Sequence, residues 1–302
     1  MLPFARVSIV GLGLIGSSIA RGVRATMPTV RLTGYDADEG VRTAADALGL
    51  CDDVADSAGA AVTDADLVIL CVPVGAIAAV AAELAPDLSA DAVVTDVGSC
   101  KASVARVLAD ALPDAAIVPA HPVAGTERSG PEAGFATLFR NRWCILTPTD
   151  RSPAQAVERV TAFWRRLGAE VECMDPDHHD RVLAVTSHLP HLIAYTIVGT
   201  AGDLEEVTRS EVIKYSAGGF RDFTRIAASD PTMWRDVFLE NREAVLDMLQ
   251  RFSEDLSALS RAIRWGDGDA LHDLFTRTRA IRRSIVEQGQ DDAREDFGRS
   301  HL

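Results

Sequence analysis

Ser99 and His121 are the residues of this sequence best suited to proton-transfer chemistry, because each follows an apolar run. The runs AVVTDVGS (92–99) and AIVPAHP (116–122) predict two strands of one sheet. Since the carboxyl ends of parallel strands meet along one edge of a sheet, both side chains are expected at a single crevice. There His121, with an ordinary pKa of about 6.5, suits a general base that takes a proton from a substrate alcohol, with Ser99 as its hydrogen-bonding neighbour.

The same residues also have plainer interpretations. His121 can cap the end of a strand, and Ser99 can N-cap a helix that starts at Cys100. Lys101, the next residue, is interpreted as a contributor to the electrostatics of the helix turn and not as a catalytic group. Spacing alone leaves the catalytic and the structural interpretations of Ser99 and His121 open.

A glycine-rich turn near the N-terminus predicts a dinucleotide site. Gly11, Gly13 and Gly16 follow the apolar run RVSIV, and Asp36 closes a second apolar run. Gly11 permits the tight turn, Gly13 lets a pyrophosphate approach the backbone, and Gly16 lets the next helix pack closely. The Asp36 carboxylate accepts hydrogen bonds from an adenine ribose and repels a 2′-phosphate, which favours NAD over NADP. The alternative is an ordinary structural turn. The other candidate cofactor-binding residues are Leu14, Ile15 and Pro73.

Further candidate substrate-binding residues lie in the second half of the chain. His188 and His191, in SHLPH, fall on one face of a predicted helix and are embedded among apolar residues. Arg225, in GGFRDFTRIAASDPTMW, can form a bidentate pair with a substrate carboxylate. The plainer alternative for that segment is a surface helix with an internal pair between Asp222 and Arg225.

No metal site is predicted. His178 and His179 lie between Asp177 and Asp180, but adjacent histidines on a helix point apart and no third ligand follows at a suitable offset. The five cysteines are scattered without a CxxC pair, a pattern that suits neither a zinc site nor a disulfide framework.

The order of the apolar runs predicts an α/β Rossmann-type nucleotide-binding domain followed by an all-α helical domain. Short β-rich runs first alternate with Ala-rich helical stretches, which is typical of a parallel sheet covered by helices. After Asp175 there is no strand candidate, and three long runs have a helical period: 177–201, 231–265 and 268–288. We therefore expect an NAD-binding domain over residues 1–173 and a helical domain for substrate binding and dimerisation over residues 174–302.

The run 231–265 has clear start and stop signals for one long helix. Asp230 is the expected N-cap, Pro231 occupies the first helical position, and Gly266 follows the end. Long amphipathic helices of this kind bury their apolar face against a neighbour. A homodimer formed through the helical domain is therefore predicted.

Composition and charge exclude several other classes of protein. At 302 residues, with 47% hydrophobic and 25% charged residues, the chain has room for about two globular domains. A net charge of -14 and the lack of a Lys/Arg-rich run argue against a nucleic-acid partner. No signal-peptide pattern opens the sequence and no apolar stretch approaches about 18 uninterrupted residues, so we expect no membrane partner and a cytoplasmic location.

Five motifs resemble, in their order, those of the prephenate dehydrogenase family of tyrosine biosynthesis: GLGLIGSS, DVGSCK, HPVAGTERSG, SHLPH and GGFRDFTRIAASDPTMW. The resemblance covers about residues 6–245. It implies NAD-dependent oxidative decarboxylation of prephenate to 4-hydroxyphenylpyruvate by hydride transfer from the ring carbinol. The alternative that it implies is the same reaction on arogenate, which gives tyrosine directly.

The resemblance also implies roles for individual residues. His121 matches the histidine that accepts the hydroxyl proton, and Ser99 matches its hydrogen-bonding neighbour. Arg225 matches the arginine that binds a substrate carboxylate, His191 matches the residue that recognises the substrate side chain, and His188 is its supporting partner. His191 favours prephenate, because an imidazole accommodates a pyruvyl group better than an ammonium group. The roles of the other nearby cations stay open: Arg128, Lys214 and Arg221.

Two remote alternatives come from other classes. A β-hydroxyacid dehydrogenase would carry a lysine and an asparagine as KxxN on the interdomain helix, where this chain has VTSHLPHLIA. A regulatory protein that senses NAD without turnover would have no need of Ser99, His121 and Arg225. An absorbance assay at the nicotinamide band distinguishes this sensor from an enzyme.

Overall fold

The fold of the chain is available as a computed structural model that describes residues 2–126, 128–208, 214 and 217–287. The chain divides into two compact units, Met1–Leu246 and Asp247–Leu302. The first unit begins with a Rossmann-type parallel sheet, and the elements described from Pro176 onward are helical. The predicted fold class is therefore confirmed, while the domain boundary at residue 173 stays a prediction.

Six parallel strands form the main sheet in the order β3-β2-β1-β4-β5-β6. They are β1 (Arg6–Val10), β2 (Arg31–Tyr35), β3 (Asp53–Val54), β4 (Leu67–Leu70), β5 (Val93–Asp96) and β6 (Ala116–Ile117). Every residue of β4 and β5 is buried, as expected of parallel strands covered on both faces. The strand order reverses between β1 and β4, and in such sheets ligands bind outside the carboxyl ends of the strands at this reversal.

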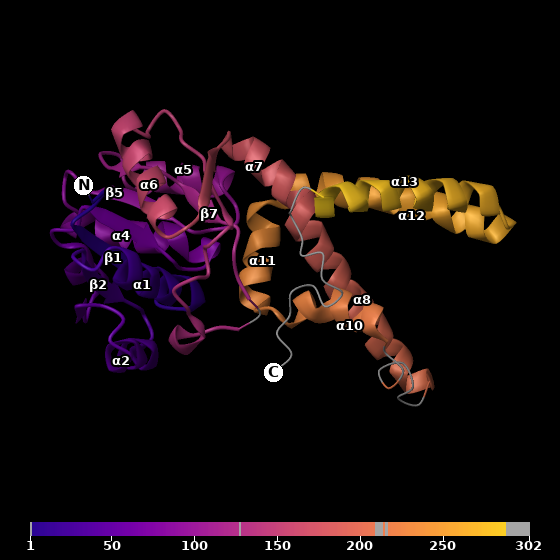
Figure 1. Cartoon of the computed structure of the whole chain (residues 1–302), viewed down its shortest axis with the longest axis horizontal. Helices are drawn as coiled ribbons and strands as arrows, with labels where there is room; N and C mark the ends of the chain where they lie inside the picture. The colour runs from indigo at the N-terminus through magenta and orange to yellow at the C-terminus, as the bar shows by residue number, and fades with distance from the viewer. Residues whose placement is uncertain (1, 127, 209–213, 215–216, 288–302) are drawn as a thin grey trace. The chain divides into compact units, whose positions relative to one another are not determined.

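Helices flank the main sheet, as Figure 1 shows for α1 and α4. The helices of this region are α1 (Leu14–Thr26), α2 (Glu39–Ala47), α3 (Ala58–Val62), α4 (Ile77–Leu84), α5 (Ala102–Ala111) and α6 (Ala154–Arg166). Neighbouring residues of a strand point to opposite faces. Accordingly, Ile69 of β4 joins the core that contains Ile19 of α1, whereas Leu70 joins the core that contains Ile77 of α4.

A second, three-stranded sheet explains one difference from the expected strands. It contains β7 (Ala120–Pro122), β8 (Trp143–Leu146) and β9 (Glu170–Cys173), and β7 runs antiparallel to β8. The predicted single strand over 116–122 is therefore wrong, because its residues are divided between β6 and β7. Pro119 lies at the division, and it has no N–H with which to continue a strand ladder.

The helical segments after β9 are α7 (Pro176–Leu183), a π-helical turn (Ala184–His188), α8 (Leu189–Thr208), α10 (Gly218–Thr224), the 3₁₀ turn η5 (Arg225–Ala228), α11 (Pro231–Glu240), α12 (Arg242–Trp265) and α13 (Gly268–Glu287). Asp230 caps α11 as predicted, because its carboxylate accepts the Met233 N–H at 2.8 Å. Gly266 follows α12 with a φ of 68°, in the left-handed region that favours glycine.

The single helix expected over 231–265 is wrong, because α11 and α12 are separate helices. Asn241 interrupts them, with φ of -106° and ψ of 33°. Its buried side chain donates from Nδ2 to the backbone oxygen of Asp180 and lies 3.1 Å from Nδ1 of His188. These contacts from another part of the chain account for the interruption.

Candidate active site

The glycine turn after β1 forms a cradle with little side-chain bulk. Gly11 has a φ of 98°, and a Cβ on it would lie 2.5 Å from the carbonyl oxygen of Cys71. A Cβ on Gly16 would collide with the carbonyl oxygen of Gly11. By contrast, a Cβ on Gly13 would meet no described atom within 4 Å. Gly13 is also the N-cap of α1 and brings no side-chain cap, so this helix N-terminus offers its N–H groups to an anion.

The Asp36 carboxylate is fixed beside this turn at the end of β2. Its Oδ2 accepts the Leu12 N–H at 2.8 Å, and its Oδ1 accepts the Asp38 N–H at 3.0 Å. The Arg42 guanidinium donates to the backbone oxygen of Asp36 at 2.8 Å. The other predicted cofactor-binding residues lie on the same edge: Leu14 and Ile15 begin α1, and Pro73 follows β4.

His121 lies in β7 and is only 8% exposed. Its Nδ1 lies 2.9 Å from Nε2 of His179, whose ring crosses that of His121 edge to face. Nδ1 of His179 lies in turn 2.8 Å from a carboxylate oxygen of Asp180. These three side chains form a continuous hydrogen-bonded series from β7 to α7.

The pKa of His121 is lowered well below its ordinary value. Burial is the main cause, because a charged imidazole loses hydration there. Positive charge at His179, Lys101 or His188 adds to the effect. Burial also lowers the pKa of His179. Both imidazoles are therefore neutral at pH 7.

Ser99 lies on the half-buried turn after β5, and within the described residues no hydrogen bond links it to His121. The structural alternative for Ser99 is wrong, because α5 starts at Ala102 and not at Cys100. Asp180 caps that helix instead, accepting the N–H groups of Lys101 at 2.7 Å and of Ala102 at 3.0 Å. A role for Ser99 toward a substrate stays a prediction.

Lys101 is fully buried, which corrects its interpretation as helix-turn electrostatics. Its ammonium group pairs with the buried carboxylate of Asp96 and donates to the Ala120 carbonyl oxygen at 2.7 Å. Asp96 also accepts the N–H groups of Gly98 at 2.7 Å and of Ala120 at 3.2 Å. The pair therefore joins the end of β5 to the start of β7, directly before His121.

The SHLPH motif (187–191) starts within a π-helical turn, Ala184–His188. Pro190 follows closely, and a proline both lacks the N–H that a regular helix requires and crowds the preceding turn. Such π-helical turns are frequent at functional sites. His188 is fully buried beside Trp234, and burial lowers its pKa to about 4.

His191 stacks on Trp234 of α11, with ring centroids 3.6 Å apart. Its Nδ1 lies 2.8 Å from the carbonyl oxygen of Ser187. Because a carbonyl only accepts, Nδ1 carries the proton and Nε2 of the neutral ring is an acceptor. Burial lowers the pKa of His191, and the positive charge of Arg225 lowers it further. That influence places Arg225, at the start of η5, near His191.

The three cations left open by the sequence, Arg128, Lys214 and Arg221, have exposed side chains. Arg221 lies on α10, one turn before Arg225. None of the described contacts assigns these residues a role. Among the described residues, no group of three or more His, Cys, Asp or Glu side chains is arranged to hold a metal ion.

Two family models match the chain on either side of the end of β9. One, described as "Prephenate dehydrogenase, nucleotide-binding domain", matches residues 19–173, and the other, "Prephenate dehydrogenase, dimerization domain", matches residues 175–277. The chain belongs to the prephenate dehydrogenase family. The dimerization model covers the helices that carry His188, His191 and Arg225.

Individual prephenate dehydrogenase relatives match over nearly the whole chain. A cyclohexadienyl dehydrogenase of Zymomonas mobilis is 48% identical and aligns over 94% of this chain and 97% of its own length. A prephenate dehydrogenase of Bacillus subtilis is 35% identical over 91% of this chain and 75% of its own. The crystal structure of Aquifex aeolicus prephenate dehydrogenase with hydroxyphenyl propionate and NAD+ superposes with a TM-score of 0.87, at 36% identity over 94% of this chain and 98% of its own.

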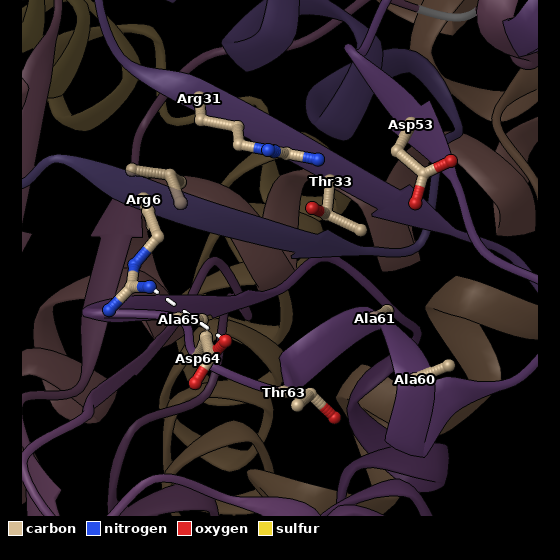
Figure 2. Close-up of a pocket in the computed structure, with 10 residues that line it drawn as sticks. Arg6, Arg31, Thr33, Asp53, Ala60, Ala61, Thr63, Asp64 and Ala65 are labelled. Carbon is tan, nitrogen blue, oxygen red and sulfur yellow. Dashed lines mark ion pairs between the residues drawn. The ribbon is translucent and has the colours of Figure 1, made fainter.

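A small pocket lies away from this candidate site, at the amino ends of the strands. Figure 2 shows Arg6, Arg31 and Asp53, which begin β1, β2 and β3. Arg6 pairs there with Asp64 at 3.8 Å, and both side chains are largely exposed. Ligands of parallel sheets bind at the opposite edge. This pocket is therefore separate from the cofactor cradle.

The helical stretch Pro176–Asp203 is long and apolar enough to cross a membrane by length and composition. It nevertheless contains His188 and His191 of the site and packs against α10 and η5. Thr186, Ser187, His188 and His191 interrupt its apolar residues, so it is not an uninterrupted apolar run. In a prephenate dehydrogenase it belongs to the segment matched as a dimerization domain.

Sequence reasoning missed His179 and Asp180 as members of the site. The sequence presents them only as possible metal ligands, and the adjacent pair on α7 gives no sign of a partner on β7. The available signal was His179-Asp180 itself, because a carboxylate beside an imidazole is a common way to fix its tautomer. The partner at His121, however, lies 58 residues away.

Proposed function

We propose that this protein catalyses the NAD-dependent oxidative decarboxylation of prephenate to 4-hydroxyphenylpyruvate in tyrosine biosynthesis, with His121 as the base. The observation that carries the proposal is the neutral, buried imidazole of His121, hydrogen-bonded at Nδ1 so that Nε2 is left for a substrate proton. Membership of the prephenate dehydrogenase family supports the choice of substrate.

The cradle after β1 fits NAD. The open space at Gly13 leaves room for a pyrophosphate at the N-terminus of α1, and the fixed carboxylate of Asp36 suits the ribose hydroxyls of a cofactor without a 2′-phosphate. Leu14, Ile15 and Pro73 complete the proposed contacts. When bound, NAD accepts the hydride from the ring carbon that carries the hydroxyl group.

Nε2 of His121 takes the proton of the ring hydroxyl as the C–H bond of that carbon breaks. The carbonyl that results then draws in the electron pair of the bond to the ring carboxylate, which leaves as carbon dioxide. The same imidazole returns its proton to the carbonyl oxygen, and the aromatic product forms. Burial around His121 excludes the water that would compete for this proton. Ser99 is proposed to be the hydrogen-bonding neighbour of His121 beside the reacting hydroxyl.

Arg225 is proposed to bind a substrate carboxylate, and His191 to contact the side chain that distinguishes the substrates. His188 is proposed to hold these residues in place, because it is fully buried and contacts both Asn241 and Trp234. The effect of charge at His188 on His121, and of Arg225 on His191, supports one continuous site.

NADH formation on prephenate and arogenate, with NADP as a control cofactor, tests this function. We expect a clear rate with NAD and prephenate and a lower rate with NADP. No rate with either substrate would contradict the proposal and would favour the alternatives, a β-hydroxyacid dehydrogenase or an NAD sensor.

Arogenate is the second candidate substrate, because of the hydrogen bond between His191 and Ser187. With its proton on Nδ1, neutral His191 presents an acceptor at Nε2. An ammonium group donates to such an acceptor, whereas the keto oxygen of prephenate would need a donor. The expectation that His191 favours prephenate therefore loses its physical basis. A higher kcat/KM on arogenate in the same assay would establish this candidate.

Arg225→Ala is expected to raise the KM for prephenate by about 10- to 150-fold, because a charged hydrogen bond of about 1.5 to 3 kcal/mol is lost. Steady-state kinetics at saturating NAD measure this change. Arg221→Ala, one helical turn earlier, is the matched control and should alter KM far less. An unchanged KM in the Arg225 variant would remove this residue from the site.

We also propose that the protein is a homodimer. The second family model is described as a dimerization domain, and the helical segments expose many apolar side chains. They include Val185, Ile197, Val198, Leu256, Ile263, Trp265, Phe275 and Ile281. Such surfaces are costly in water and are typical of interfaces. Light scattering at micromolar concentration is expected to give twice the chain mass, and a monomer mass would contradict the dimer.

A cytoplasmic location is part of the same proposal. All five cysteines are free thiols, as is usual in a reducing compartment. The acidic net charge of -14 gives no support for a nucleic-acid partner. Fractionation of cells that produce the tagged protein tests the location.

A further inference from the structure

The buried carboxylate of Asp180 forms hydrogen bonds both with the start of α5 and with the neighbouring His179. Its two carboxylate oxygens accept the N–H groups of Lys101 and Ala102, and Oδ1 also lies 2.8 Å from Nδ1 of His179. Backbone N–H groups only donate, so both oxygens act as acceptors, as they do in a carboxylate. The group that faces Asp180 from His179 must therefore be a donor.

This requirement fixes the protons along the whole series. His179 carries its proton on Nδ1, and because it is neutral its Nε2 is an acceptor. Nδ1 of His121, 2.9 Å from that acceptor, must then carry the proton of its own ring. The lone pair of neutral His121 is left on Nε2 alone.

We propose that His179 and Asp180 are positioning residues that hold His121 in the one tautomer whose Nε2 can accept the substrate proton. This inference rests on the role of His121 as base under the proposed function. His179 and Asp180 need not touch the substrate, because they act through Nδ1 of His121.

The series also steadies the charge that His121 acquires during turnover. When Nε2 takes the proton, the imidazolium donates from Nδ1 to His179 in a charge-assisted hydrogen bond, which is stronger than a neutral one. His179 in turn donates to the Asp180 carboxylate. Positive charge on Lys101 or His188 opposes this protonation. The Asp96 carboxylate, which accepts the Ala120 N–H next to His121, is paired with Lys101. The hydrogen-bonded series through His179 to the Asp180 carboxylate favours the protonated form of His121 and so offsets the effect of that positive charge.

Asp180 connects this arrangement to the substrate-binding segment. Its backbone oxygen accepts a hydrogen bond from Nδ2 of Asn241 at 2.8 Å, and the same amide lies 3.1 Å from Nδ1 of His188. The residue that orients the base is thus held by the interruption between α11 and α12. This explains why an asparagine, and not a helix-forming residue, is useful at 241.

His179→Leu, His179→Gln and the matched control His178→Leu test the proposal. Leucine removes the acceptor, so kcat on the better substrate is expected to fall by a factor on the order of 10². Glutamine offers Oε1 as an acceptor and should keep kcat within about tenfold of the wild type. His178 is the exposed neighbour on α7, and its replacement should leave kcat unchanged.

The double variant with His121→Asn separates positioning from general damage. If His179 acts through His121, adding His179→Leu to His121→Asn should cause no further loss of kcat. An equal additional loss in both backgrounds would overturn the proposal, as would a His179→Leu enzyme within twofold of the wild type, or equal losses for leucine and glutamine. A wild-type rate for His121→Asn would instead overturn the assignment of the base, and this inference with it.

Asp180→Asn provides a second route should His179→Leu fail to fold. The amide has nearly the same shape and can keep one capping bond to α5, but its N–H₂ group can donate to His179 and so reverse both tautomers. We expect kcat to fall by a factor on the order of 10² to 10⁴ while the thermal melting curve stays cooperative. A rate within twofold of the wild type would overturn the proposal.

Discussion

His121→Asn is expected to lower kcat by a factor on the order of 10² to 10⁴ and to leave NAD affinity nearly unchanged. Asparagine is polar and of similar size, but it cannot take up a proton from the substrate hydroxyl. The cradle of Gly11, Gly13 and Asp36 makes no described contact with His121, so cofactor binding should persist. Stopped-flow or steady-state NADH formation gives kcat, and quenching of the protein's tryptophan fluorescence on titration with NAD gives the affinity.

The pH profile of the wild type provides an independent check of the same base. Because burial lowers the pKa of His121, the imidazole stays neutral and active well below pH 6.5. The rate should therefore be retained through neutral pH and lost only as acid protonates Nε2, at a pKa below the ordinary value. A wild-type rate in His121→Asn would exclude this role. So would a wild-type rate that, as the pH is lowered, is already lost above pH 7.

Lys101→Met is expected to destabilise the folded protein by about 3 to 5 kcal/mol, the usual cost of removing one partner from a buried ion pair. Methionine has a similar length, so little volume is lost. The carboxylate of Asp96 would remain fully buried without its cation, and the Ala120 carbonyl oxygen would lose a donor. Chemical denaturation followed by tryptophan fluorescence measures the change in unfolding free energy.

Arg6→Met is the matched control for Lys101→Met. Arg6 pairs with Asp64 at the surface, where both side chains are more than half exposed (Figure 2). Exposed pairs contribute about 0 to 1 kcal/mol, so this variant should unfold almost as the wild type does. Equal destabilisation of the two variants would show that the buried pair of Lys101 contributes no more to the unfolding free energy than the exposed pair of Arg6.

The nucleotide-binding part of the fold was predictable from the sequence because its signals are local. The strand, the glycine turn, the helix and Asp36 occupy one short stretch, and each element there is favoured by its own residues. The same holds for the cap at Asp230 and for the end of α12 at Gly266. In each case neighbouring residues supply both the constraint and its solution.

The candidate base was also predictable, since His121 closes an apolar run and strand ends collect ligands. Its partner was not. The expected neighbour Ser99 follows from the position of strand ends, but the observed partner His179 comes from α7, which packs beside α5 through the cap that Asp180 provides. A cap supplied by a distant segment leaves no pattern in the sequence.

The sequence by itself determined the Rossmann-type fold, the cofactor cradle and the candidate base, because these depend on period, glycine conformation and strand ends. Only the tertiary structure decided the hydrogen-bond partner of His121, the burial of Lys101 and the interruption at Asn241. Each of these depends on a hydrogen bond or ion pair with a group from another element. A buried polar side chain must find such a partner, and only the packed chain shows which partner it found.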